Sequence, residues 1–374
     1  MASYLDVSAA VHHRAGLGRY AESLARALAP LLPDRLALFY NRERGVEPLP
    51  GLESLPASTV ALGYKPWRML VWMGQLARVG FNRLAPDAEL FHATEHLLIP
   101  LRGVPTVLTV HDLIFRRLPE QHKPLNRWYL NLTMPLYCRR ATHIIAISEQ
   151  TRRDLASAYG IAAERTTVIY EAADPRFLPQ LPEAMAGARA RYHLPERYLL
   201  FVGTIEPRKN LTRLLTAFER LHAEGLTDAL VIVGKRGWLT GEFDAALERS
   251  PLRAAVIFPG FVPDEDLPAI YAGAQALVMP SLYEGFGLPV LEAMACATPV
   301  ACSNHSSLPE IAGDAAMFFD PVETDSISDA LRRIVRDPAL QAHLRDAGLR
   351  QASQFSWERA AQETLAVYRR FASQ

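Results

Sequence analysis

Residues 283–295, with the sequence YEGFGLPVLEAMA, lie between two short apolar segments at 276–279 and 299–302. This order predicts a strand, a glycine loop and a helix, a unit from which parallel α/β sheets are built. Gly285 and Gly287 allow the backbone to approach a ligand closely, and Pro289 suits the first turn of a helix, where a missing N–H costs little. The backbone amides at this helix start would bind an anion.

Two carboxylates flank the glycine loop, Glu284 before it and Glu292 eight positions later. Carboxylates repel a pyrophosphate but accept hydrogen bonds from hydroxyl groups. We therefore interpret Glu292 as a partner of a ribose and Glu284 as a partner of a hexose. The amides between them would bind the charged group that lies between those two rings. This arrangement describes a nucleotide sugar. The alternative is a helix that carries acids near its N-terminus because the helix macrodipole favours them there.

The pattern of two glutamates around GFGLP resembles the retaining glycosyltransferases of family 4, and the resemblance extends over nearly the whole chain. It implies an α/β protein with the GT-B fold, in which two doubly wound Rossmann-like domains face each other across a cleft. It also implies a metal-independent hexosyltransferase, similar to mannosyltransferases and glucosyltransferases of polysaccharide biosynthesis. The UDP- or GDP-linked hexose is a substrate, so neither a cofactor nor a metal is expected. Donor-binding residues implied in this loop are Glu284, which is also catalytic, Gly285, Phe286, Gly287, Leu288 and Glu292.

Length and composition agree with a two-domain globular protein. The chain has 374 residues, of which 49% are hydrophobic and 21% are charged. No segment approaches the roughly 18 consecutive apolar residues of a membrane span, and the first residues lack the pattern of a signal peptide. We therefore expect a cytoplasmic protein. Three cysteines, Cys138, Cys296 and Cys302, lie in or beside apolar segments without metal-binding spacing, so free buried thiols are expected.

The domain boundaries follow from strand periodicity and proline content. We predict an acceptor-binding domain at 1–178, an interdomain linker at 179–196, a nucleotide-sugar-binding domain at 197–355 and a last helix at 356–374. Residues 171–196 contain four prolines and interrupt the strand pattern, which indicates a hinge. The resemblance implies that the last helix returns to the first domain.

A second glycine loop, Gly16 and Gly18 in AGLGRYAESL, opens a predicted helix at 17–31 after a predicted strand at 3–7. GLGRYA formally satisfies the dinucleotide fingerprint of a dehydrogenase. About nine residues separate it from the strand, however, and no acid closes the next strand, so that function is disfavoured. In the resembled family this loop faces the donor phosphates.

His111 and Asp112 follow a predicted strand at 106–110, at the edge where ligands bind in open α/β sheets. A lone histidine at a strand end is commonly structural, bonded to a neighbouring backbone group. The family resemblance instead makes His111 a catalytic residue that touches the transferred sugar or the acceptor.

Arg208 and Lys209 precede a helix predicted from apolar spacing at 211–221, with Asn210 as the expected N-cap. Two cations at a helix start oppose the macrodipole unless an anion lies between them. They would bind a diphosphate leaving group, whose charge grows as the glycosidic bond breaks. The resemblance gives the matching residues this catalytic and donor-binding role, and it places the nucleobase near Val262.

Residues 64–83, YKPWRMLVWMGQLARVGFNR, combine Trp67, Trp72 and other apolar side chains with cations and contain no acid. This segment is either a core helix or an interfacial helix drawn to anionic lipid. The charge distribution favours an anionic partner for the first half, since residues 1–178 carry 21 − 16 = +5 and residues 179–374 carry 19 − 24 = −5. We hypothesise peripheral association with the inner face of the cell membrane and an acceptor that is a lipid-linked or surface glycan. No nucleic-acid partner is expected.

Two other classes stay open at this point. A sugar phosphorylase or nucleotide-sugar epimerase with the same fold would also bind phosphate and sugar. A non-catalytic nucleotide-sugar-binding protein would keep the fold without turnover, although the presence of Glu284, Glu292, Arg208, Lys209 and His111 argues against it.

Overall fold

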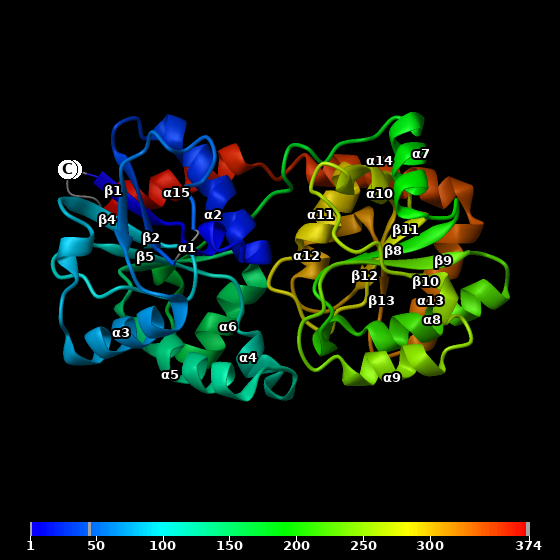
Figure 1. The fold of residues 1–374 in the computed structure, drawn as a ribbon, viewed down its shortest axis with the longest axis horizontal. Helices are drawn as coiled ribbons and strands as arrows, with labels where there is room; N and C mark the ends of the chain where they lie inside the picture. Colours follow the sequence, from blue (N-terminus) through cyan, green and yellow to red (C-terminus); the bar gives the residue numbers. More distant parts are fainter. Residues whose placement is uncertain (1, 44–45, 372–374) are drawn as a thin grey trace. The chain divides into compact units, whose positions relative to one another are not determined.

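A computed structural model describes residues 2–43 and 46–371. The chain forms two compact units (Figure 1). The first comprises Met1–Arg116, Pro124–Glu171 and Ser356–Gln374, and the second comprises Arg117–Lys123 and Ala172–Phe355. Among the described helices, none combines the length and apolar character needed to cross a membrane.

The first unit is built on a sheet with the strand order β3-β2-β1-β4-β5-β6-β7, and every neighbouring pair is parallel. Its strands are β1 (Ala2–Asp6), β2 (Leu36–Asn41), β3 (Ala57–Val60), β4 (Ala88–Ala93), β5 (Thr106–Val110), β6 (His143–Ala146) and β7 (Thr166–Val168). The strand order reverses between β1 and β4, so the sheet is doubly wound.

Helices cover both faces of this sheet, as Figure 1 shows. They are α1 (Ser8–Val11), α2 (Ala15–Leu28), α3 (Tyr64–Ala77), α4 (Ile114–Arg117), α5 (Pro124–Arg140), α6 (Glu149–Tyr159) and α15 (Trp357–Phe371). Helices α2 and α15 pack together on one face, and α3, α5 and α6 lie on the other. Ser148 caps α6 as predicted, because its side chain accepts a hydrogen bond from the amide of Thr151.

The second unit has a parallel sheet of the order β10-β9-β8-β11-β12-β13, which reverses between β8 and β11. Its strands are β8 (Tyr198–Val202), β9 (Ala229–Val233), β10 (Val256–Ile257), β11 (Ala276–Met279), β12 (Val300–Ser303) and β13 (Met317–Phe319). Its helices are α7 (Pro182–Tyr192), α8 (Leu211–Ala223), α9 (Gly241–Arg249), α10 (Leu267–Gly273), α11 (Leu288–Ala295), α12 (Leu308–Ala312), α13 (Thr324–Arg336) and α14 (Pro338–Ala352).

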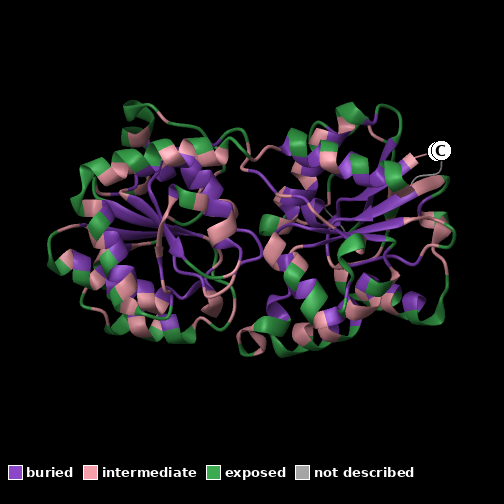
Figure 2. Ribbon diagram, turned by 180° about the vertical axis from the view of Figure 1, so that it is seen from behind, coloured by how far each residue is buried: buried purple, intermediate pink, exposed green. Residues whose placement is uncertain are grey.

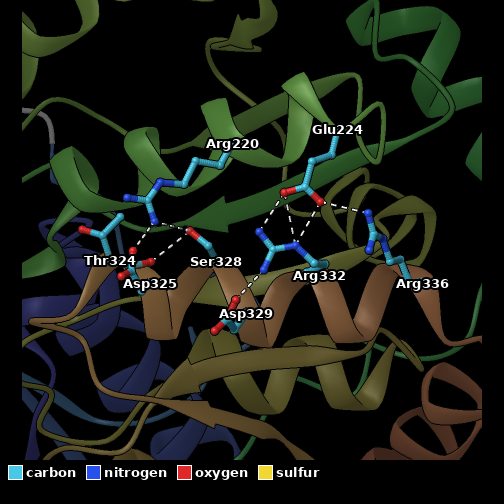
Figure 3. A network of polar contacts seen from close by, with 8 residues as sticks. All are labelled: Arg220, Glu224, Thr324, Asp325, Ser328, Asp329, Arg332 and Arg336. Atoms are coloured by element: carbon cyan, nitrogen blue, oxygen red, sulfur yellow. Dashed lines mark hydrogen bonds and ion pairs between the residues drawn. The ribbon is translucent and has the colours of Figure 1, made fainter.

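An ion-pair network joins α8 to α13 on one face of the second sheet (Figure 3). Arg332 and Arg336 of α13 both contact the carboxylate of Glu224, at 2.7 and 3.0 Å, and Arg220 of α8 pairs with Asp325. Single exposed ion pairs contribute little to stability, but here one carboxylate pairs with two arginines, and such a network holds the two helices together more firmly.

Figure 2 shows buried strands at the centre of each unit and exposed residues on the outer helix surfaces. The side chain of Trp67 is fully buried, with Phe39 and Phe81 as ring neighbours. This position contradicts an interfacial role for Trp67. Trp72, one turn later, is half-buried against Trp128 and Tyr129. Helix α3 therefore has a core face as well as an exposed face. Cys138, Cys296 and Cys302 are free and buried.

The predicted linker at 179–196 is not a bare connection. It contains α7, which belongs to the second unit and is tied to the start of α10, since Arg191 pairs with Asp266 at 2.6 Å. The second unit starts at Ala172, and the chain returns to the first unit at Ser356. Pro182 is the first residue of α7, a position that suits proline.

Candidate active site

The predicted donor residues of the second unit lie after β8 and β11, the two adjacent strands at which the strand order reverses. Arg208 and Lys209 belong to a short 3₁₀ turn at Pro207–Lys209, and Glu284 follows β11. In open α/β sheets this reversal creates the crevice in which ligands bind. The backbone joins the two loops directly, because the amide of Leu282 donates to the carbonyl of Arg208 at 2.8 Å.

Glu284 is buried between the two cations. Its Oε2 accepts from Nη1 of Arg208 at 2.7 Å, and its Oε1 accepts from Nζ of Lys209 at 2.6 Å. Burial opposes the charged form of Glu284, but Arg208 and Lys209 outweigh it and lower its pKa to about 2. Burial, followed by the neighbouring charge of Arg208, lowers the pKa of Lys209.

A further carboxylate completes this cluster, because Glu206 pairs with Nε of Arg208 at 2.6 Å. Two cations and two carboxylates leave the cluster without net charge. The cations predicted to meet a diphosphate therefore already have partners in the protein, which the sequence did not indicate. A phosphate that binds here would exchange or extend these contacts.

The glycine loop has the conformation that its sequence predicts. Gly287 has φ 117°, and a β-carbon at this position would lie 2.7 Å from Cδ2 of Leu308. The hydroxyl oxygen of Ser306 accepts from the amide of Glu284 at 2.9 Å. The Ser307 hydroxyl contacts the carbonyls of Glu284 and Phe286 at 3.1 and 2.7 Å. The loop after β12 therefore fixes the positions of residues 284–287.

Glu292 is the fifth residue of α11 and is buried. Its Oε2 accepts from the hydroxyl of Tyr271 at 2.6 Å, and the ring of Tyr271 packs edge-on against Phe177. Tyr271 thus orients the carboxylate that the sequence assigns to a ribose. Val262 is half-buried in the loop after β10, next to Phe261, whose side chain is 88% exposed.

Asn210 does not cap α8 with its side chain, contrary to the expectation. It adopts the left-handed conformation with φ 58°, and its amide donates to the carbonyls of Pro280 and Pro321 at 3.0 and 2.7 Å. Asn210 instead joins the turn that contains Lys209 to the segments after β11 and β13.

In the first unit, the loop after β1 leads into α2. A β-carbon on Gly18 would lie 2.9 Å from the carbonyl oxygen of Ala9, so close packing explains this glycine. Gly16 has open space around its α-carbon, and the positive φ angles of the loop fall on His13 and Ala15. No steric requirement in the described structure accounts for Gly16.

His111 follows β5 and is held at both ring nitrogens. Nδ1 lies 3.2 Å from Oε1 of Glu171, and Nε2 lies 2.8 Å from the carbonyl oxygen of Thr94. Burial alone would lower the pKa of His111, but the hydrogen bond and charge of Glu171 raise it above its ordinary value. Tyr20 packs edge-on against the imidazole, with 4.8 Å between ring centroids. Asp112 uses its carboxylate locally, to accept from the amide of Ile114.

Two buried acids lie beside His111. Thr94 donates to the carbonyl of Asp6, the last residue of β1, and Glu95 pairs with Arg14 at 2.8 Å. Burial and the nearby charge of Glu95 raise the pKa of Asp6 to about 7. Sequence reasoning did not single out Asp6, Glu95 or Arg14, although Asp6 ends β1 and Glu95 lies two residues after the end of β4, the two strands at the reversal point.

The predicted residues thus form two groups, one in each unit. Arg208, Lys209 and Glu284 are in contact, and Glu292 lies on α11, the helix that follows the loop of Glu284. His111, Gly16 and Gly18 belong to the first unit. The partners that sequence reasoning missed, Tyr271 and Glu171, lie 21 and 60 positions from the residues they hold, so no local motif indicates them.

Comparison with known proteins agrees with this architecture. Residues 14–177 match the family described as Glycosyltransferase Family 4, and residues 189–351 match that described as Glycosyl transferases group 1. O-antigen chain mannosyltransferase B of Escherichia coli is 32% identical over 369 residues, which cover 95% of this chain and 96% of the relative.

Solved structures show the same fold. Sucrose-phosphate synthase from Thermosynechococcus elongatus has a TM-score of 0.79 at 22% identity, with 99% of both chains covered. Anabaena HepE, solved in complex with UDP, has a TM-score of 0.75 at 19% identity, with 99% of this chain and 100% of that chain covered. Two doubly wound parallel sheets with this likeness define the GT-B fold. The chain belongs to glycosyltransferase family 4.

Proposed function

We propose that the protein transfers a hexose from a nucleoside diphosphate to a hydroxyl of a glycan, with retention of anomeric configuration and without a metal ion. The observation that carries this proposal is the buried Glu284, held ionised by Arg208 and Lys209 next to the glycine loop. An ionised carboxylate accepts hydroxyl hydrogen bonds, and the cations paired with it would bind a diphosphate. The two adjacent loops after β8 and β11 thus combine a sugar-binding group with phosphate-binding groups.

The roles follow from this chemistry. Arg208 and Lys209 stabilise the negative charge that develops on the leaving diphosphate, in place of a divalent cation. Glu284 binds a hydroxyl of the transferred hexose, and Glu292, oriented by Tyr271, binds the ribose. The backbone near Val262 receives the nucleobase. The leaving phosphate itself assists attack of the acceptor from the same face, which gives retention.

His111 serves the reacting sugar or the acceptor from the first unit. Glu171 and the Thr94 carbonyl fix its ring, and the raised pKa favours the cationic form. Both N–H groups of a cationic imidazole are donated to Glu171 and Thr94, so His111 would act on the donor sugar through its positive charge. Gly18 lies in the first turn of α2 and allows that turn to pack closely on α1.

The transferred sugar is proposed to be mannose, because the relative that covers almost the whole chain is a mannosyltransferase. That relative acts on an O-antigen chain, so a glycan or a lipid-linked glycan is the acceptor that we propose. Such acceptors place the enzyme at a membrane surface, and we propose peripheral association through the cationic first unit. GDP and UDP both remain as candidate nucleotides.

Transfer assays with GDP-mannose, UDP-glucose and mannose-terminated oligosaccharides test this proposal, with product linkage determined by NMR. We expect an α-linked product from an α-linked donor, and undiminished turnover in EDTA. Turnover that EDTA abolishes and magnesium restores would contradict metal independence. A β-linked product from the same donor would contradict retention.

A further inference from the structure

Exposed apolar side chains gather on two adjacent helices of the first unit. Of the 15 large hydrophobic residues that are exposed within 2–43 and 46–371, eight lie on α3, on α5 or just after α3. On α3 these are Met69, Leu70, Met73 and Leu76, followed by Val79. On α5 they are Leu125, Trp128 and Leu132. We call these residues the α3–α5 face. Such a concentration on a soluble unit indicates a contact surface.

The two helices that carry this face are packed firmly. Trp72 of α3 contacts Trp128 and Tyr129 of α5, with ring centroids 6.0 and 6.5 Å apart. The hydroxyl of Tyr129 donates to the carbonyl of Arg68 at 3.2 Å. The exposed residues therefore project from a fixed pair of helices that the core anchors through Trp67.

The charge on these helices is of one sign. Helix α3 contains Lys65 and Arg68, helix α5 contains Arg127, Arg139 and Arg140, and neither helix contains an aspartate or glutamate. An apolar face on two helices whose charged residues are all cationic is complementary to an anionic lipid surface, where apolar groups enter the interfacial region and cations meet headgroups.

A cavity of about 460 Å³ lies beside this face, at the C-terminal ends of α3 and α5. Arg78, Arg102 and Arg140 line it, together with apolar residues of the segment 98–101, and its lining contains no carboxylate. Val79 belongs both to the cavity and to the α3–α5 face. This volume is in the range of small-ligand sites, and three guanidinium groups suit a phosphate.

Arginines at helix C-termini also interact with the last carbonyls, and two of these do so. Arg140 donates through Nη1 to the backbone carbonyl of Gln75 and to its side-chain oxygen, the latter at 2.7 Å, and Arg102 donates through Nη2 to the carbonyl of Arg78 at 2.6 Å. A guanidinium has five N–H donors. These contacts use one nitrogen of each group, so they orient the guanidinium groups and leave donors for a phosphate.

We propose that this cavity binds the phosphate headgroup of an anionic phospholipid while the α3–α5 face lies against the membrane surface. The inference deepens the proposed membrane association and identifies its ligand and residues. It does not depend on which donor the enzyme uses.

Co-sedimentation of the full chain with phosphatidylcholine vesicles, with and without phosphatidylglycerol, tests the cavity. The variant Arg78→Gln/Arg102→Gln removes two exposed cations from it. Its matched control, Lys65→Gln/Arg83→Gln, removes two exposed cations that do not line the cavity. We expect the control pair to lose about fivefold in partitioning per cation. The cavity pair should lose about tenfold more than the control pair, because hydrogen bonds to a charged group are lost as well.

A second comparison tests the apolar face. Met73→Ser/Leu76→Ser should lower partitioning, whereas Leu181→Ser/Val322→Ser, at exposed positions of the second unit, should not. Equal losses of vesicle partitioning in Arg78→Gln/Arg102→Gln and Lys65→Gln/Arg83→Gln would overturn the headgroup site. Binding to neutral vesicles as strong as binding to vesicles with phosphatidylglycerol would overturn the choice of an anionic lipid. A thermal shift with soluble glycerol phosphate as large as the shift with phosphatidylglycerol vesicles would also overturn it.

Nucleotide binding, measured on the same samples, separates this inference from the proposed function. Vesicle binding without affinity for a nucleoside diphosphate would refute the proposed function and leave the headgroup site standing. Nucleotide binding without vesicle binding would refute the headgroup site and leave the proposed function standing. Melting temperatures of all variants establish that each is folded.

Discussion

At the scale of single residues, Asp6 is a buried carboxylate whose charge the folded protein disfavours. Burial and Glu95 raise its pKa from 3.8 to about 7. Between pH 3.8 and about 7 the folded state therefore holds the proton of Asp6 more tightly than the unfolded state does. The free energy of unfolding falls as pH rises through this range. We expect Asp6→Asn to increase the free energy of unfolding by about 2 kcal/mol at pH 8, and by much less at pH 4. Urea unfolding at both pH values measures this, and a variant destabilised equally at both would contradict it.

His111 provides a second prediction at this scale, because Glu171 is the acid that raises its pKa. We expect Glu171→Gln to lower the pKa of His111, observable in an NMR titration of its ring protons. The stability that this pair contributes is present below pH 6.5 and is lost as pH rises, so the variant should be destabilised more at pH 5.5 than at pH 8. Glu164→Gln, an exposed substitution, is the control. An unchanged His111 titration would refute the role given to Glu171.

At the scale of elements, the glycine loop before α11 depends on a backbone conformation that other residues rarely adopt. Gly287→Ala should destabilise the protein by about 1–3 kcal/mol, because φ is 117° and the new methyl group would meet Leu308. Gly187→Ala is the control, since Gly187 lies in α7 with open space around its α-carbon and should be neutral or slightly stabilising. Chemical denaturation measures both. Equal effects would show that the loop tolerates a side chain.

Short apolar runs predicted several strands to the residue, among them Thr106–Val110 and Ala276–Met279, because central parallel strands are buried on both faces. Strand β3 was not predicted, since its alternately exposed residues ASTV give a weak signal at a sheet edge. Helix α7 was hidden among prolines. In the site, Glu284, Arg208 and Lys209 came from motifs, whereas Tyr271 and Glu171 became visible only in the fold, because long-range packing brings them to their partners.

At the scale of the whole molecule, the last helix belongs to the first unit. In α15 the hydroxyl of Tyr368 contacts Nδ1 of His92 at 2.7 Å, and Nε2 of His92 contacts Thr109 at 2.7 Å. Removal of residues 356–374 would expose this buried network and the face of α2. We expect hydrogen exchange to show lost protection in β1, β4 and β5, with β8, β9 and β11 still protected. Full protection of the first sheet after truncation would contradict this.

The central claim is that Glu284 binds the sugar and Glu292 binds the nucleotide, and calorimetric titration of Glu284→Ala and Glu292→Ala tests it most directly. The ligands are a free nucleoside diphosphate and the matching nucleotide sugar. Glu292→Ala should weaken both by about tenfold, through the lost ribose contact. Glu284→Ala should leave the free diphosphate unchanged or bound more tightly, since Arg208 and Lys209 lose a competing carboxylate, and should weaken the nucleotide sugar by about tenfold. Equal losses of affinity for the free diphosphate in both variants would contradict the account.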